Sequence, residues 1–283
     1  MSKRFGNHEV LQHISFSLSE RDFVALIGPN GAGKSTLLSI LIGLLRADAG
    51  HVSFLGHDIA KLGAEERLET GYVPQEFRGF EWLQAGELLD YIAAFYPRER
   101  RHWPELEDWA SLPRRTRVRE LSGGQRQRLA IVLALRHRPQ IALLDEPVSS
   151  LDPKARRDFV QLLHADCKER GSTCLLSSHI LSDLESLADR SLIMHQGRLL
   201  GDWSSKDRCE DLRWLDPVAR DSEPKELPAC LMTLAREAEG RLLVSGWRQC
   251  APELRAQVEE SWRSTIPADM ESIFLALTSA RQA

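Results

Sequence analysis

Uninterrupted apolar runs in the first two thirds of the chain predict buried strands, because a strand covered on both faces carries apolar side chains at consecutive positions. The clearest runs are residues 23–27, 141–144 and 173–177. Residues 71–75 predict a further strand that ends in the polar side chain of Gln75. Loose alternation over residues 9–18 predicts one or two strands at the edge of a β subdomain.

Helical periodicity separates these strands and predicts an α/β fold with a parallel sheet. A helix is expected over residues 122–135, and another over 153–170, where Asp152 caps the start and Pro153 fits the first turn. Residues 83–112 are also helical, with a break at Pro97, and predict a small helical subdomain. The tryptophans of this region either pack its core or form an apolar contact patch.

The strongest chemical signal is a glycine-rich turn between the strand at 23–27 and an apolar helical run at 37–41. Glycines let such a turn wrap its amide N–H groups around phosphate oxygens, and the following helix dipole favours the same anion. Lys34 is placed to reach the β- and γ-phosphates, and Ser35 to bind Mg²⁺. The predicted nucleotide loop contains Gly28, Asn30, Gly31, Ala32, Gly33, Lys34, Ser35 and Thr36.

Residues 121–125 open a second helix with the same affinity for anions. A serine stands near its amino end, and two glycines expose backbone amides. The alternative is an ordinary helix cap. If each chain binds one nucleotide, at residues 28–36, this second helix start that favours anions has no ligand of its own. Its candidate binding residues are Ser122, Gly123, Gly124 and Gln125.

Acidic and polar side chains follow the predicted strands at the edge where α/β sheets bind ligands. Asp145 is suited to hold Mg²⁺ through its water shell, and Glu146 to polarise the attacking water. Gln75 is either a third metal contact or a solvated loop residue. His179 follows the strand at 173–177 and is interpreted as a γ-phosphate sensor, although a lone histidine is more often structural.

Composition narrows the classes of function. The net charge of −4 gives no electrostatic reason to expect nucleic acid as a partner. The five cysteines are odd in number and far apart, without a Cys-x-x-Cys pair, which argues against a zinc site and a disulfide framework and fits a reducing cytosol. The amino terminus has no apolar signal core, and the longest apolar stretch, 37–45, is about half a membrane span.

Taken together, these residues resemble the ATP-binding-cassette (ABC) family over about residues 5–203. In the terms of that family, residues 28–36 match the Walker A loop, Gln75 the Q-loop and residues 121–125 the signature. Residues 141–145 match Walker B, Glu146 its catalytic glutamate, residues 149–152 the D-loop that includes Asp152, and His179 the switch histidine. Phe5 occupies the place of the aromatic residue that stacks on adenine; otherwise it is a core or exposed phenylalanine.

The resemblance implies a P-loop ATPase with a RecA-like core, an antiparallel β subdomain and a short helical subdomain at about 76–120. This nucleotide-binding domain would span residues 1–203, with a small α+β accessory domain at 204–283. The family usually has another strand before Phe5, so the outer β subdomain is expected to be short. ATP and Mg²⁺ are the implied cofactors, with Glu146 and His179 as catalytic residues and with Ser35, Gln75 and Asp145 around the metal.

The resemblance also implies a head-to-tail dimer in which residues 122–125 of one subunit close over ATP on the other. The partners would be integral-membrane permease subunits and a second ATPase subunit, identical or paralogous, with no nucleic acid. The chain would lie at the cytoplasmic face of a bacterial plasma membrane, held there through the permease. Residues 94–97 look like a branch of bacterial transporter ATPases with export-type permeases.

The last 80 residues leave two interpretations open. An apolar stripe of Met270, Ile273, Phe274 and Leu277 predicts a terminal helix. It resembles the terminal helix of exporters, or it docks on its own domain. The leading prediction is an ATP-hydrolysing export subunit. The alternatives are an ABC ATPase that drives a membrane protein mechanically without cargo, and a non-transport ABC ATPase acting on ribosomes or DNA.

Overall fold

The structure is a computed structural model that describes residues 1–54, 56–178, 187–218, 227–237, 240–266 and 270–279. The chain divides into two compact units, residues 1–199 and 200–283. The division predicted after residue 203 falls inside strand β10 (Arg198–Ser204) and stays a prediction. No helix of the described residues combines the length and the apolar character needed to cross a membrane.

Six strands form the central sheet in the order β10-β9-β3-β8-β7-β6. The strands β3, β6, β7, β8 and β9 pair in parallel, as the continuous apolar runs of β3, β7 and β8 predict, whereas β9 was not predicted. Their bounds are β3 Phe23–Ile27, β6 Thr70–Val73, β7 Ile141–Leu144, β8 Thr173–Ser178 and β9 Arg190–His195. The carboxyl ends of β3, β7 and β8 therefore meet at one edge of the sheet, where the predicted loops begin.

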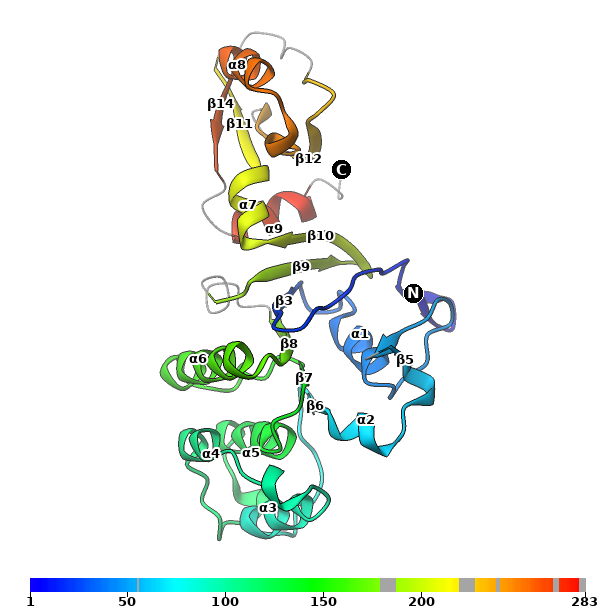
Figure 1. Cartoon of the computed structure of the whole chain (residues 1–283), viewed down its shortest axis with the longest axis vertical. Coiled ribbons are helices and arrows are strands. Elements are labelled where there is room, and N and C mark those ends of the chain that lie inside the picture. Colours follow the sequence, from blue (N-terminus) through cyan, green and yellow to red (C-terminus); the bar gives the residue numbers. More distant parts are fainter. Residues whose placement is uncertain (55, 179–186, 219–226, 238–239, 267–269, 280–283) are drawn as a thin grey trace. The chain divides into compact units, whose positions relative to one another are not determined.

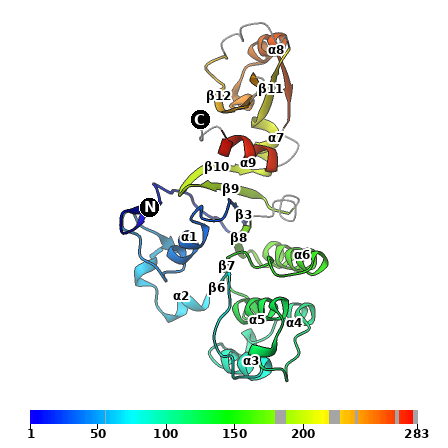
Figure 2. The same ribbon diagram turned by 180° about the vertical axis from the view of Figure 1, so that it is seen from behind.

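Helices cover both faces of this sheet. Figures 1 and 2 show α1 (Lys34–Leu41) and α6 (Pro153–Arg170) on opposite sides of it. The helical subdomain holds α3 (Ala85–Ala93), η2 (Arg98–Arg100), α4 (Pro104–Ala110) and η3 (Val118–Glu120). It leads into α5 (Gly123–Leu135), which contacts β6, while α4 contacts both α5 and α6.

The outer β subdomain is short. In it β1 (Lys3–Phe5) pairs with β2 (His8–Leu11), and β4 (Ser53–Phe54) pairs with β5 (His57–Asp58). The strand prediction over residues 9–18 is correct as far as Leu11 and wrong beyond it. Residues 12–18 form no strand in the described structure, and His13 has a φ of +50°, which interrupts an extended chain. The connection to β6 contains η1 (Ile59–Lys61) and α2 (Ala64–Leu68).

The core of this unit is built from the apolar strands and from the inward face of α1. Leu26, Leu37, Leu143 and Leu175 are fully or almost fully buried in one cluster. At about 25 cal/mol per Å² of buried apolar surface, such burial is the main stabilising contribution. It also fixes the predicted nucleotide loop of residues 28–36, called the phosphate loop below, because this loop joins β3 to α1 and both elements are anchored in this cluster.

The second unit carries a four-stranded antiparallel sheet in the order β12-β13-β11-β14. Its elements are α7 (Ser205–Asp211), β11 (Arg213–Pro217), β12 (Met232–Arg236), β13 (Leu242–Ser245), η5 (Trp247–Gln249), α8 (Pro252–Ser261), β14 (Trp262–Thr265) and α9 (Met270–Ser279). Met270, Ile273 and Leu277 are buried, and α9 contacts β12. This favours the interpretation in which the terminal helix docks on its own domain.

The sequence argued against a disulfide framework, and the structure has a single bonded pair among the described cysteines. Cys230 and Cys250 are joined in the second unit, with their Cα atoms 5.5 Å apart. They are separated by 20 positions along the chain, so only folding brings them together. Cys167 and Cys174 are buried free thiols, and Cys209 is an exposed one.

His137 gives the fold a predictable response to acid. Its ring is fully buried and stacks on Tyr96 with 4.1 Å between ring centroids. Burial, assisted by the nearby positive charge of Arg100, lowers the pKa of His137 to about 4. The folded pKa lies below the unfolded value of 6.5, so the unfolded chain binds the extra proton between these values.

The stabilising contribution of neutral His137 is therefore complete above pH 6.5 and is lost as the pH falls toward 4. We expect the free energy of unfolding of the wild-type chain to decrease by about 2 kcal/mol between pH 7 and pH 5 through this residue. His137→Phe keeps an aromatic ring against Tyr96 but cannot titrate. Urea unfolding at both pH values should show a smaller decrease for the variant, and equal decreases would contradict the assignment.

Candidate functional site

The turn between β3 and α1 lines a cavity of about 210 Å³. Gly31 and Gly33 have φ angles of +80° and +100°, a backbone region that residues with a Cβ atom rarely adopt. A Cβ on Gly33 would also lie 2.8 Å from the Leu11 side chain, whereas a Cβ on Gly31 would meet no atom within 4 Å. The cavity is lined by Val10, Asn30, Gly31, Gly33, Lys34, Ser35, Thr36, Gln75 and Glu146.

Gly28 and Ala32 shape this turn from behind. A Cβ on Gly28 would lie 2.5 Å from the Met194 carbonyl oxygen, so β3 and β9 approach too closely for any side chain there. Ala32 is almost fully buried. The sequence assigned both residues to nucleotide binding, and the structure places both outside the cavity lining, where they hold the loop in position.

Lys34 is a buried cation at the amino end of α1. Its Nζ donates hydrogen bonds to the carbonyl oxygens of Gly28 at 2.8 Å and Pro29 at 3.2 Å. It also forms an ion pair with Glu146 Oε1 at 3.2 Å, and both side chains are more than nine-tenths buried. A charge pair in such surroundings is screened far less than a surface pair. The cation that the sequence assigns to phosphate thus lies beside the carboxylate that it assigns to water.

Asp145 and Glu146 follow β7 and are held by a serine of the next strand. The Ser177 hydroxyl donates to Asp145 Oδ1 at 2.8 Å and accepts from the Glu146 N–H at 2.9 Å. Glu146 has a φ of +46°, a strained conformation of the kind that occurs at functional sites. Sequence reasoning missed Ser177. The available signal was a hydroxyl at the end of an otherwise apolar buried strand.

The side chains assigned to Mg²⁺ offer oxygen atoms, the ligands that this ion prefers. Ser35 and Gln75 both line the cavity. Asp145 is buried outside the cavity lining and accepts a hydrogen bond from Ser177. This donor set fits a hydrated magnesium ion held between the loop and β7. No cluster of three acidic, histidine or cysteine side chains suited to a metal occurs among the described residues.

Residues 122–125 stay outside this cavity in their own chain. Ser122 and Gln125 form a capping box at the start of α5: the Gln125 N–H donates to Ser122 Oγ at 3.2 Å, and the Ser122 N–H donates to Gln125 Oε1 at 3.0 Å. Ser122 and Gly123 are exposed, and a Cβ on Gly123 would meet nothing within 4 Å. The remaining first-turn amides of α5 are therefore presented at the surface.

Two further predicted residues also lie away from the cavity lining. Phe5 is 52% exposed on β1, with the Lys3 Nζ 5.4 Å from its ring centroid. Asp152 is exposed and caps α6 through its Oδ1, which accepts from the N–H groups of Lys154 and Ala155. Both roles at a nucleotide stay predictions. His179, the predicted phosphate sensor, lies outside the described residues.

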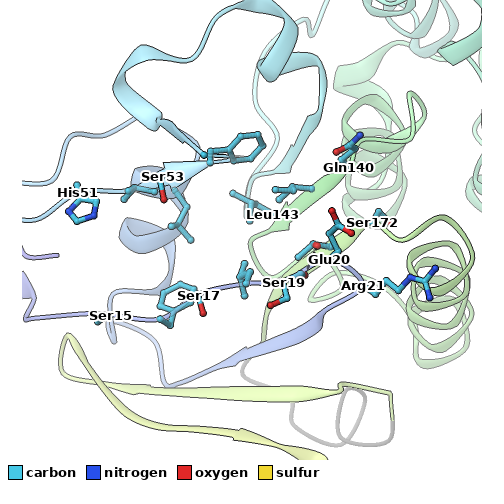
Figure 3. Close-up of a pocket in the computed structure, with 18 of the residues that line it drawn as sticks. Ser15, Ser17, Ser19, Glu20, Arg21, His51, Ser53, Gln140, Leu143 and Ser172 are labelled. Atoms are coloured by element: carbon cyan, nitrogen blue, oxygen red, sulfur yellow. Dashed lines mark hydrogen bonds between the residues drawn. The ribbon is translucent and has the colours of Figure 1, made fainter.

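A larger cavity, of about 890 Å³, lies elsewhere in the first unit. Figure 3 shows it between the segment of Ser15, Ser17 and Ser19 and the segment of His51 and Ser53. Residues 140–141 and 172–173 also line it, and these are the amino ends of β7 and β8. The phosphate loop and Glu146 follow the carboxyl ends of β3 and β7, so this cavity is separate from the candidate nucleotide site.

Known proteins are similar to this chain in sequence. The sequence profile of the ABC transporter family matches residues 11–149. The Nod factor export ATP-binding protein I of Mesorhizobium japonicum is 30% identical over 98% of this chain and 85% of that protein. The aliphatic sulfonates import ATP-binding protein SsuB of Cupriavidus necator is 37% identical over 71% of this chain and 66% of that protein.

A solved structure extends the likeness to three dimensions. The dimeric ATP-binding cassette MJ0796, in a post-hydrolysis state bound to ADP and Pi, superimposes with a TM-score of 0.64 and 27% identity. The match covers 72% of this chain and 94% of that one. The fold class predicted from the motifs is thereby confirmed. This chain belongs to the ATP-binding proteins of ABC transporters.

Proposed function

We propose that the chain is the ATP-hydrolysing subunit of an exporter and works as a dimer at the cytoplasmic face of a bacterial plasma membrane. One observation carries the proposal. The cavity collects Lys34, Ser35, Gln75 and Glu146, while the exposed start of α5 lies outside it in the same chain. A second subunit, head to tail, brings that helix start to the nucleotide. The MJ0796 cassette is itself described as dimeric.

The residues at the cavity divide the work of ATP hydrolysis. Loop amides and Lys34 would hold the phosphates, and Ser35, Gln75 and the buried Asp145 would hold Mg²⁺. When bound, the ion would supply positive charge to neutralise the charge that develops on the phosphate oxygens. Glu146 polarises the attacking water, and its ion pair with Lys34 orients the carboxylate before the reaction. Closure of the dimer over ATP and its reopening after hydrolysis are the movements that act on the permease.

The surface that receives a permease is proposed on the helical subdomain. Trp82, Tyr91 and Phe95 are 72%, 54% and 64% exposed, and the Tyr91 and Phe95 rings pack edge to face. Exposed aromatic groups of this kind mark protein interfaces. The segment starts shortly after Gln75, so movement at the nucleotide is transmitted to it directly. The direction of transport is proposed from the Nod factor export protein, whose alignment also covers the second unit.

Copurification tests this function. Affinity-tagged chain, isolated from detergent-solubilised membranes of its own bacterium, is expected to retain one integral-membrane permease identified by mass spectrometry. Trp82→Ser together with Phe95→Ser should lower the recovered permease about tenfold and leave basal ATPase activity unchanged. Leu44→Ser removes an equally exposed apolar side chain, 69% exposed, outside the helical subdomain and serves as control.

An unchanged permease yield from the double variant would contradict the proposed docking surface. Transport itself is tested in vesicles prepared from cells that lack or contain the chain. An exporter moves a cargo only when this chain and ATP are present. A permease partner without any such cargo would favour the alternative of a purely mechanical ATPase.

A further inference from the structure

Trp109 lies where three helices meet. It stands near the end of α4, and its indole N–H donates to the Ala155 carbonyl oxygen of α6 at 3.0 Å. Its ring packs on the buried Phe159 of the same helix, with 4.9 Å between centroids. The guanidinium of Arg128, from α5, lies 5.4 Å from the Trp109 ring centroid. One side chain of the helical subdomain thus contacts both α5 and α6.

Arg128 closes this junction from the other side. Its Nη2 faces Asp152 Oδ2 at 3.4 Å, and its Nη1 faces the Ala110 carbonyl oxygen at 3.5 Å. The other oxygen of Asp152 caps α6. Asp152 therefore divides its two carboxylate oxygens between α6, which it starts, and α5, which carries Arg128.

This junction lies close to two loops, residues 122–125 and residues 149–152. Arg128 lies five residues after the first residue of α5, about 7.5 Å along the helix axis. The loops themselves touch, because a Cβ on Gly124 would lie 3.2 Å from the Ser150 carbonyl oxygen. Residues 122–125 and residues 149–152 thus lie close together, and the contacts of Arg128 and Trp109 join the helices that follow them.

We propose that Arg128 and Trp109 are positioning residues for dimer closure, because they fix the spacing between loop 122–125 and loop 149–152. The inference rests on the proposed function, in which both loops face the partner subunit. Neither residue lines the nucleotide cavity of its own chain. Loss of the junction therefore weakens ATP-driven association of subunits and leaves ATP binding to a single subunit intact.

Two conservative variants test this role. Arg128→Gln removes the charge and the planar fork, and Trp109→Phe keeps a ring against Phe159 but removes the N–H donor. Both are made in a Glu146→Gln background, which slows hydrolysis. We expect ATP-induced dimerisation, measured by analytical ultracentrifugation, to weaken about tenfold in each. The affinity of the monomer for a fluorescent ATP analogue should stay unchanged.

The chain supplies a matched control at the other end of α4. There the Arg138 guanidinium lies 5.2 Å from the Trp103 ring, the same type of contact at a distance from both loops. Arg138→Gln should lower the melting temperature without changing dimerisation. If Arg128→Gln and Trp109→Phe dimerised as strongly as their parent, the positioning role would be wrong. If the parent itself failed to dimerise with ATP, the proposed function would fall as well.

Discussion

Replacing Glu146 by glutamine is expected to reduce ATP turnover at least about a hundredfold while ATP stays bound, because the amide cannot accept a proton from water. Glutamine keeps the size of the side chain, so the loop and the Ser177 contact to the backbone N–H of residue 146 are retained. The charge facing Lys34 is lost, and the nucleotide phosphates then take up the Lys34 charge alone. ATP should accordingly hold the variant as a stable dimer.

Phosphate release and size-exclusion chromatography with ATP measure both halves of this expectation. Glu65→Gln changes an exposed glutamate on α2 and serves as the control, with activity and elution equal to the unmodified chain. Hydrolysis at the normal rate in the Glu146→Gln variant would remove Glu146 from the catalytic role. If the variant lost hydrolysis but formed no dimer with ATP, the catalytic role of Glu146 would stand and the proposed closure of the dimer would be contradicted.

Lys34→Ala is expected to weaken ATP binding about 10- to 100-fold, which corresponds to one charged hydrogen bond to phosphate lost at 1.4 kcal/mol per tenfold change. The substitution also removes the buried cation that faces Glu146, so a lower melting temperature is expected. Titration with a fluorescent ATP analogue measures the affinity. Lys61→Ala, at an exposed lysine of η1, is the control, and equal affinities for the two variants would exclude the phosphate role of Lys34.

The parts of the fold that follow from local chemistry were predictable. The helix expected over 153–170 has these bounds in the structure, because Asp152 caps it, Pro153 fits its first turn and Gly171 ends it with a φ of +78°. The phosphate loop was equally clear, since its glycines, lysine and serine have a fixed spacing. Signals of this kind need no knowledge of distant residues.

The parts that depend on long-range packing were not predictable. The Cys230–Cys250 bond requires the fold of the second unit to bring the two thiols together. The sequence left open whether Trp109 packs in a core or forms a contact patch. In the structure it is half-buried at a junction of three helices. Ser177 acquires its role only because β8 lies beside β7. None of these neighbours can be identified from sequence spacing alone.

The central claim is that residues 122–125 of one subunit complete the site built around Lys34 of the other, and subunit mixing tests it most directly. Gly123→Asp suits this purpose, because its side chain meets open space in the single chain but would repel a phosphate there. Lys34→Ala subunits mixed with Gly123→Asp subunits should regain ATPase activity, since one site of each mixed dimer is intact. Chains carrying both changes should inactivate wild-type subunits. The claim would be contradicted if the mixture of Lys34→Ala and Gly123→Asp subunits recovered no activity and if wild-type subunits kept one active site per dimer when paired with the double variant.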